Sequence, residues 1–213
     1  MEFVRRLEGI AREHGIDLGE LRAVSGPDAG AETPAERGTV LVFPRAVDNF
    51  HVRIQLRRTF ALSEGWTDDL VTVMGVVGLW RQGCRLRELH DRFPFMSWSE
   101  LAQGFEDGDP VPAKWRELLS SDWHSADRPL LRAAHDHPEL RRFYPDISHH
   151  SLMLSGNPFE HDLESGLAKI TPLSEDEDHY RVSVLPTGVL REVASLTEAL
   201  EVAAAGFRSL EGA

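Results

Sequence analysis

Two segments far apart in this chain have the two-residue alternation of half-buried β-strands. In FHVRIQL, residues 50–56, every second side chain from Phe50 to Leu56 is apolar, and the residues between them are polar. Tyr180, Val182 and Val184 repeat the pattern near the other end of the chain. Because successive side chains on a strand point to opposite faces, each segment has one face to bury and one to leave in water. The alternation is typical of antiparallel sheets.

Further strands are predicted beside these two. TVLVF, residues 39–43, precedes 50–56 and is expected to pair with it through the connecting PRAVDN. After residue 151, SLMLS, AKITPL and VLREV also have strand composition, and PTG at 186–188 predicts a short hairpin loop. Strands are therefore expected at both ends of the chain. The simplest closure is one antiparallel or mixed sheet built from N-terminal and C-terminal strands.

The residues between these strands, 66–145, are predicted to form a helical block. DDLVTVMGVVGLWRQG, 68–83, is apolar on nearly all sides and long enough for a buried helix. SWSE, 97–100, has the spacing of a capping box at a helix start. Asp127 followed by Pro129 marks another start, because proline suits the first turn of a helix.

Amphipathic helices are expected at both ends, over residues 2–14 and again over residues 195–210, after the last strand. GPDAGAETPAERG, 26–38, has turn residues and little to bury, so it is predicted to be a flexible loop. The whole chain, 1–213, is thus expected to be a single α+β domain, with the strands and terminal helix of 151–210 following the helical block.

Composition excludes several classes of function. The 213 residues carry 35 acidic and 23 basic side chains and a net charge of −12, so neither nucleic acid nor an anionic membrane is an expected partner. The longest apolar run, Leu70 to Trp80, is too short to span a bilayer, and the first residues have no apolar signal segment. We expect a cytoplasmic protein. The single cysteine, Cys84, excludes an internal disulfide and is interpreted as an apolar filler.

Histidine is concentrated in one part of the chain, with six of the ten between residues 124 and 161. In FYPDISHHSLMLSG, His149 is a candidate proton shuttle, because imidazole titrates near neutral pH. Tyr144, Asp146 and Ser148 are the predicted catalytic residues around it. The alternative is that this polar segment satisfies backbone groups where helices give way to strands. Strand period predicts that one of His149 and His150 faces inward and the other outward, and an inward His149 could meet these side chains.

Other residues are assigned to substrate binding or to packing. Trp98, Trp123 and His150 are the predicted substrate-binding residues, whereas Trp80 and Trp115 lie on helix faces expected in the core. No diagnostic metal-ligand spacing is present, and HDH at 135–137 fits a polar helix end. No motif for a dinucleotide, a nucleotide triphosphate or a serine nucleophile occurs. We therefore expect no cofactor and no metal. The acidic SEDED, 174–178, is interpreted as a solvated loop.

Several short motifs occur in an order that resembles an uncharacterised actinobacterial family, whose members are described only as natural product biosynthesis proteins. The resemblance covers roughly residues 60–205. The matching residues are Gly65-Trp66, Asp69-Leu70, Leu79-Trp80, Gly83, Glu100 to Ala102, Phe105-Glu106, Gly108, Trp115, Tyr144-Pro145, Ser148-His149, Leu152 and Leu154-Ser155. The resemblance implies a role in a secondary-metabolite pathway and implies no particular reaction.

Three hypotheses follow. The first is an accessory or tailoring protein that performs cofactor-free acid–base chemistry, such as cyclisation, isomerisation or elimination, on a small molecule or modified peptide. The second is a non-enzymatic binding, immunity or scaffold protein whose acidic surface fits a partner protein. The third and weakest is a metal-dependent hydrolase. The sequence leaves open whether the protein is an enzyme at all.

Overall fold

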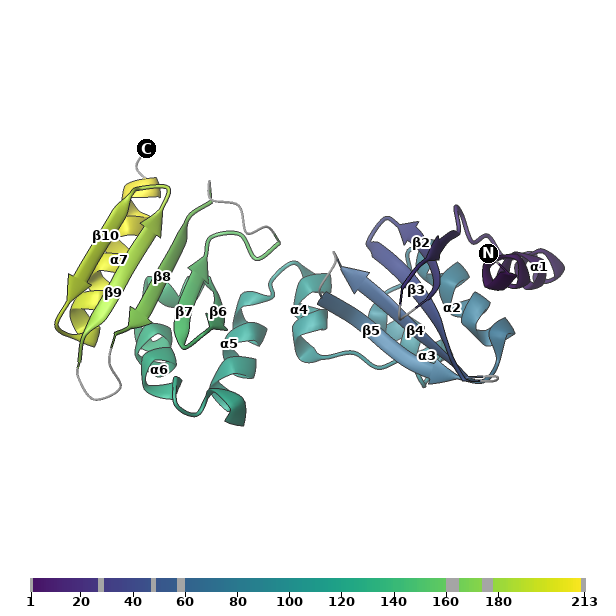
Figure 1. Ribbon diagram of the computed structural model, residues 1–213, viewed down its shortest axis with the longest axis horizontal. Coiled ribbons are helices and arrows are strands. Elements are labelled where there is room, and N and C mark those ends of the chain that lie inside the picture. Colours follow the sequence, from purple (N-terminus) through teal and green to yellow (C-terminus); the bar gives the residue numbers. More distant parts are fainter. Residues whose placement is uncertain are drawn as a thin grey trace. The chain divides into compact units, whose positions relative to one another are not determined.

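The computed structural model describes residues 2–26, 29–46, 49–56, 60–159, 165–173 and 178–211 (Figure 1). The chain divides into two compact units, Met1–Gly108 and Asp109–Ala213, and each has its own hydrophobic core. The predicted α+β class is confirmed. The N-terminal and C-terminal strands do not share a sheet as expected for a single domain: among the described residues each unit contains its own five-stranded antiparallel sheet.

The first unit is an antiparallel meander covered by helices. Its strands are hydrogen-bonded in chain order, β1-β2-β3-β4-β5, so each pairs with the next one along the sequence. The elements are α1 Glu2–His14, β1 Arg22–Val24, β2 Gly30–Ala35, β3 Gly38–Ala46, β4 Asn49–Leu56, β5 Phe60–Thr67, α2 Leu70–Arg81, α3 Leu86–Arg92 and α4 Glu100–Asp107. The predicted helix at 2–14 and the predicted pairing of 39–43 with 50–56 are confirmed.

Helix α2 is the central helix of this unit because its sequence is apolar on most sides. It begins at Asp69, whose carboxylate accepts hydrogen bonds from the backbone N–H groups of Val71 and Thr72. Its buried side chains, Val73 and Val77 among them, pack in one core with the inward-facing residues of the sheet. The helix predicted at 68–83 is thus confirmed, with slightly shorter bounds.

The flexible loop predicted at 26–38 is wrong over most of its length, because Gly30–Ala35 is strand β2. Thr33 is buried there, and its hydroxyl donates to the carbonyl oxygen of Leu18 at 2.5 Å. At Gly30 a Cβ atom would lie 2.3 Å from the carbonyl oxygen of Val42, so glycine is required by the close approach of β3. The turn-like composition of this segment reflects backbone proximity within a sheet rather than mobility. Residues 27 and 28 lie outside the described residues.

The second unit contains the remaining sheet and its helices. Its strand order is β10-β9-β8-β7-β6, again with neighbouring strands antiparallel. The elements are α5 Val111–Ser120, the short 3₁₀ helix η1 Asp122–His124, α6 Arg128–Asp136, η2 Leu140–Arg142, β6 Tyr144–Ser148, β7 Ser151–Ser155, β8 Leu167–Pro172, β9 Tyr180–Leu185, β10 Val189–Val193 and α7 Leu196–Glu211. The predicted C-terminal helix and the hairpin loop at 186–188 are confirmed. Most of SEDED lies outside the described residues.

Helix α7 covers one face of this sheet (Figure 1). Alternate residues of the strands, such as Ile170 and Val184, are fully buried beneath it. At Gly206 a Cβ atom would lie 2.7 Å from a methyl group of Val184, so the absence of a side chain lets α7 approach β9 closely. Trp115 is buried in the same core, and its indole N–H donates to the carbonyl oxygen of Arg141 at 2.9 Å, as its assignment to packing predicted.

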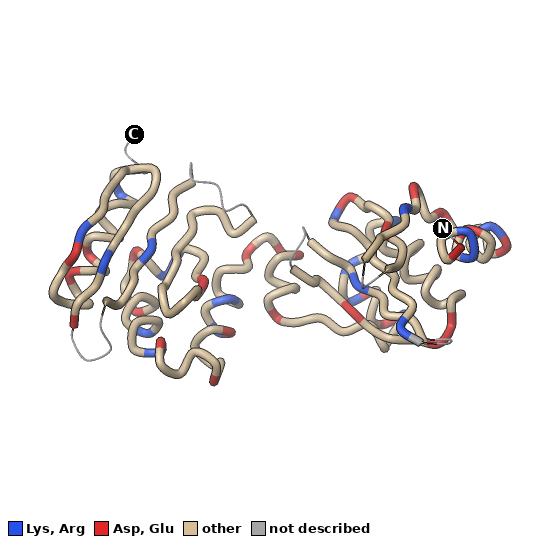
Figure 2. Tube along the Cα trace, viewed as in Figure 1, with Lys and Arg blue, Asp and Glu red and all other residues tan. Residues whose placement is uncertain are grey.

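Acidic and basic residues are interspersed along the trace of both units (Figure 2). Among the described residues, none of the helices combines the length and the apolar character needed to cross a membrane.

Candidate functional site

The two adjacent histidines form the turn of the β6–β7 hairpin. Ser148 pairs with Ser151, which leaves His149 and His150 as a two-residue loop. Their φ angles are 49° and 58°, the signs required by the type I′ turn that suits the twist of a hairpin. The prediction that strand period turns one histidine inward is therefore wrong. Neither residue belongs to a strand, and both side chains are exposed at the turn of the hairpin.

Positive φ is unusual at these positions. For residues with a Cβ atom the left-handed region costs roughly 1–2 kcal/mol each, and glycine or asparagine normally occupies it. Among the described residues, His149 and His150 are the only non-glycine residues with positive φ. Backbone strain of this kind is found preferentially at functional sites, where the side chain is what the position requires.

His150 contacts a buried carboxylate from a different element. Its Nδ1 atom lies 3.0 Å from Oδ1 of Asp127 at the start of α6. The other carboxylate oxygen, Oδ2, lies 3.5 Å from Nδ1 of His124 in η1. Asp127 is 8% exposed, whereas the His150 side chain is 77% exposed. We call these three residues, His124, Asp127 and His150, the His-Asp-His cluster.

The position of Asp127 explains why its carboxylate is available to the histidines. It occupies the N-cap position of α6, but its side chain forms no capping hydrogen bond. A buried carboxylate needs donors, and the helix N-terminus favours a negative charge there. The donor at 3.0 Å is Nδ1–H of His150, so the proton of the neutral imidazole is assigned to Nδ1. The Nε2 atom then carries the free lone pair that a general base requires.

The predicted catalytic residues lie along β6 and its turn. Tyr144, Asp146 and Ser148 occupy alternate positions and therefore one face of the strand. The Ser148 hydroxyl lies 3.0 Å from Nδ1 of His149. Oδ1 of Asp146 accepts from the Ile147 N–H at 3.0 Å. The structure thus brings Ser148 and His149 into direct contact, and the same carboxylate of Asp146 is 4.0 Å from the amine of Lys114.

Tyr144 is suited to donate a hydrogen bond and poorly suited to lose its proton. Burial raises the pKa of its hydroxyl well above the ordinary value of 10.0, and the carboxylates of Asp146 and Glu117 raise it further. The phenol therefore stays protonated at neutral pH. In acid–base chemistry this side chain would act as a hydrogen-bond donor to a substrate oxygen.

The predicted substrate-binding tryptophans lie in different units. Trp123 belongs to η1, directly before His124, and is 94% exposed. Trp98 lies in the first unit, where its ring makes an edge contact with His90 at a centroid distance of 5.1 Å. It lines a small cavity of about 290 Å³ together with Glu64 and neighbouring residues. The assignment of both tryptophans to substrate binding remains a prediction.

The contacts of Asp127 with His124 and His150 are not apparent from the sequence. The sequence marks Asp127 only as a helix start, and His124 only as one member of a histidine-rich region. The signal that could have linked them is the spacing of three residues between His124 and Asp127, which lets both side chains meet within one turn. The contact with His150 has no local signal, because 23 residues separate it from Asp127.

The first unit contains a buried histidine that sequence reasoning assigned only to the polar face of a strand. His51 is 4% exposed and stacks on the Trp66 ring at a centroid distance of 4.4 Å. Its Nε2 atom lies 3.2 Å from Oε2 of Glu64, and the same oxygen accepts two hydrogen bonds from Arg53. Burial lowers the pKa of His51, an effect that Glu64 only partly offsets.

In the part of the chain that the structure describes, no group of three or more histidine, cysteine, aspartate or glutamate side chains is arranged to hold a metal ion. His135 and His137 of HDH have different neighbours: the His135 ring contacts Trp115, whereas Nε2 of His137 lies 3.5 Å from Glu201.

Comparison with known proteins gives one match. Residues 109–207 match a family described as "Family of unknown function (DUF6193)". The matched segment lies within the second unit and contains the His-Asp-His cluster and the whole β6–β7 hairpin. It overlaps the C-terminal part of the resemblance inferred from the sequence, and the description names no organism, pathway or activity. Neither the curated proteins nor the solved structures contain a match to this chain.

Proposed function

We propose that this protein is a tailoring protein of an actinobacterial natural product pathway that performs cofactor-free acid–base chemistry in the cytoplasm, with His150 as its proton-transfer residue. The observation that carries the proposal is the contact of the exposed His150 with the buried Asp127. A buried carboxylate that holds Nδ1–H fixes the tautomer and the ring orientation, and it stabilises the imidazolium formed when Nε2 takes a proton. Asp127 is then a positioning residue, because it acts through His150.

This arrangement suits reactions in which one group removes a proton and later returns it. In an isomerisation, Nε2 of His150 would take a proton from a carbon next to a carbonyl group, and the same proton would return at another carbon. No oxidant, reductant or metal is needed to balance such a step. The protonated Tyr144 hydroxyl and the Ser148 hydroxyl, both on β6, would contact substrate oxygens, with Asp146 and His149 beside them.

The role of His149 changes in this proposal. The sequence suggested His149 as the proton shuttle and His150 as a substrate-binding residue. Nδ1 of His149 contacts the neighbouring Ser148 hydroxyl, while Nδ1 of His150 contacts the carboxylate of Asp127. We therefore propose that the two histidines exchange roles, with His149 orienting the substrate.

Deleting the gene and comparing metabolites tests the proposal and identifies the substrate. The deletion strain is expected to accumulate one intermediate and to lose a later product. Wild-type protein supplied on a plasmid should restore the product, and the His150→Gln protein, present at the same level, should not. An unchanged metabolite profile on deletion, or full restoration by the His150→Gln protein, would exclude this acid–base role.

Non-enzymatic binding is the second candidate function, and the exposure of Trp123 favours it. An aromatic side chain that is 94% exposed is costly to leave in water and is a frequent anchor in protein interfaces. A pull-down with wild-type and Trp123→Ala protein distinguishes the two candidates. A stoichiometric partner that is lost in the variant, together with an unchanged metabolite profile on gene deletion, would favour the binding protein.

A further inference from the structure

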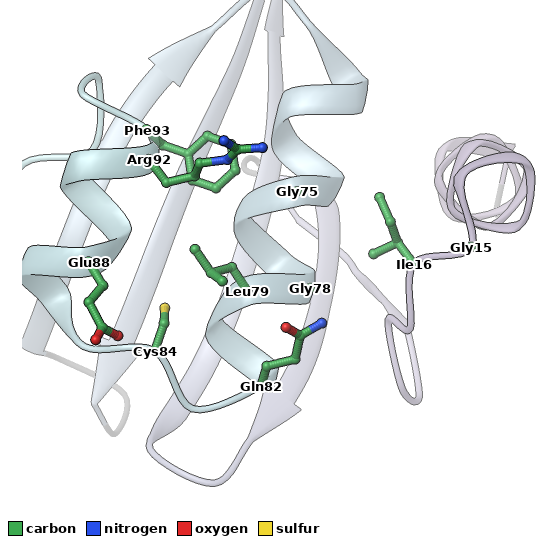
Figure 3. Close-up of a pocket in the computed structure, with 10 residues that line it drawn as sticks. All are labelled: Gly15, Ile16, Gly75, Gly78, Leu79, Gln82, Cys84, Glu88, Arg92 and Phe93. Atoms are coloured by element: carbon green, nitrogen blue, oxygen red, sulfur yellow. The ribbon is translucent and has the colours of Figure 1, made fainter.

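A second site can be argued in the first unit, where a cavity of about 510 Å³ lies over helix α2 (Figure 3). It is lined by α2, by the segment after α1 and by the region from Cys84 to Phe93. None of the residues discussed for acid–base chemistry contributes to it. Its volume falls within the range typical of small-molecule sites.

Two glycines of α2 determine the shape of this cavity. A Cβ atom at Gly75 would lie 2.9 Å from the Phe93 ring, and one at Gly78 would lie 2.8 Å from a methyl group of Ile16. The bare helix surface therefore lets Phe93 and Ile16 approach α2 from opposite sides. Leu79 points into the space between α2 and α3, so the walls that these residues provide are apolar (Figure 3).

The thiol of Cys84 also lines the cavity and is neutral at physiological pH. Burial is the main cause that raises its pKa to about 11, and the nearby cation Arg37 opposes this only in part. A thiol of this kind is a weak nucleophile and behaves as a small apolar surface. The region around Cys84 and Leu79 is thus suited to a hydrocarbon group.

The charged residues at the rim differ in their availability. The carboxylate of Glu88 already has a hydrogen-bond donor within the protein, because it accepts from the backbone N–H of Arg85 at 2.9 Å. Arg92 is exposed, lies beside Phe93, and forms no ion pair within the described residues (Figure 3). A ligand therefore meets an available positive charge at the Arg92 end and an acidic group at the Glu88 end. This asymmetry favours an anion whose charged group lies at Arg92.

We infer that this cavity binds a small apolar carboxylic acid. Its carboxylate would accept two hydrogen bonds from the Arg92 guanidinium, whose planar geometry matches a carboxylate. Its hydrocarbon part would lie along α2 against Leu79 and Cys84. Gln82, the C-cap of α2, lies seven positions after Gly75, which corresponds to about 10 Å of helix axis. An extended medium-length chain fits that distance.

Decanoate is a suitable probe for the full-length protein, with decanol and decyltrimethylammonium as matched neutral and cationic probes. Calorimetric titration should give saturable binding of decanoate and weaker binding of both other probes. In methyl NMR spectra, decanoate should shift the signals of Ile16 and Leu79 but not that of Leu152, which is buried in the other unit. Arg92→Gln should weaken decanoate binding about tenfold, which corresponds to about 1.4 kcal/mol, and should leave decanol unchanged.

Arg87→Gln is the matched control, because Arg87 is an exposed arginine on the same helix that does not line the cavity. It should bind decanoate like the wild-type protein. Equal loss of binding in both variants would show a general charge effect and would overturn the inference, as would equal affinity for decanoate and decanol, or the absence of saturable binding. Because the cavity and the His-Asp-His cluster share no residue, failure here leaves the acid–base proposal to be decided by its own experiment.

Discussion

Nδ1 of His150 lies 3.0 Å from Oδ1 of Asp127, which joins the tip of a β-hairpin to the start of a helix. The carboxylate is buried and the imidazole is largely exposed, so the contact fixes a histidine that can still meet a ligand. Fixed orientation together with an accessible second nitrogen is what a general base needs. This contact therefore carries the proposed function.

The first prediction concerns the tautomer of His150. Asp127→Asn replaces the carboxylate that accepts the Nδ1–H proton with a weaker, neutral acceptor, so the population should move toward the Nε2–H form. Long-range nitrogen–proton NMR correlations report the tautomer directly and need no substrate. His149, which contacts the Ser148 hydroxyl instead, serves as the internal control. If His150 has the same tautomer in both proteins, Asp127 does not position it.

The second prediction concerns the strained turn. His149→Val should destabilise the protein by up to about 1 kcal/mol, because a β-branched residue tolerates positive φ even less well than histidine, which already bears part of this cost. His149→Asn should be neutral or slightly stabilising, since asparagine suits the first position of a type I′ turn. Chemical denaturation measures both differences. Equal stabilities for the Val and Asn variants would mean that this backbone conformation is absent in solution.

The third prediction concerns pH. Burial lowers the pKa of His51 in the folded state below its ordinary value of 6.5, although Glu64 opposes the shift. As pH falls through 6.5, the unfolded chain therefore takes up a proton before the folded chain does, and the free energy of unfolding decreases. This stabilisation is present above that pH and is lost below it.

The His51→Phe variant tests this window, because phenylalanine can stack on Trp66 without titrating. Between about pH 7.5 and about pH 5.5, the wild-type protein should lose more stability than the variant. The carboxyl of Glu64 contributes at lower pH, because its pKa is lowered in the folded state. Burial alone would raise that pKa, but Arg53 and His51 together lower it by more. Parallel stability curves for the two proteins would show that His51 does not titrate differently on folding.

How far the sequence predicts this structure depends on how local the signals are. The alternation at 50–56 and the apolar stripe of α7 predict their elements correctly, because burial on one face imposes those periods. Strand β2 could not be predicted in the same way, since Gly30 and Pro34 are typical of turns. The division into two sheets was missed as well, because strand pairing is decided by contacts between segments and not by period.

The candidate site, too, could be predicted from the sequence only where the signal is local. The histidine-rich segment is evident from composition, and the contact between Ser148 and His149 joins residues that are adjacent in the sequence. The turn at His149 and His150 was missed because neither residue is typical of type I′ turns. The partner of His150 could not be identified, because a contact across 23 residues leaves no periodic trace.

The fourth prediction concerns the second unit alone. Because its core is built within Asp109–Ala213, a fragment of residues 109–213 should fold and unfold cooperatively. Fluorescence of the buried Trp115 provides the signal. Leu131→Ala, which empties a fully buried position, should lower the stability of the fragment by about 2–5 kcal/mol. A fragment that shows no cooperative transition would mean that the second unit needs the first.

The most direct test of the central claim is the rate at which purified protein converts the intermediate that accumulates when the gene is deleted. His150→Gln should reduce that rate by about 100-fold or more, the usual contribution of a general base, with folding unchanged. His149→Asn, at the neighbouring turn position, should retain much more activity. A His150→Gln protein that converts the intermediate at the wild-type rate would contradict the assignment of His150 as the proton-transfer residue.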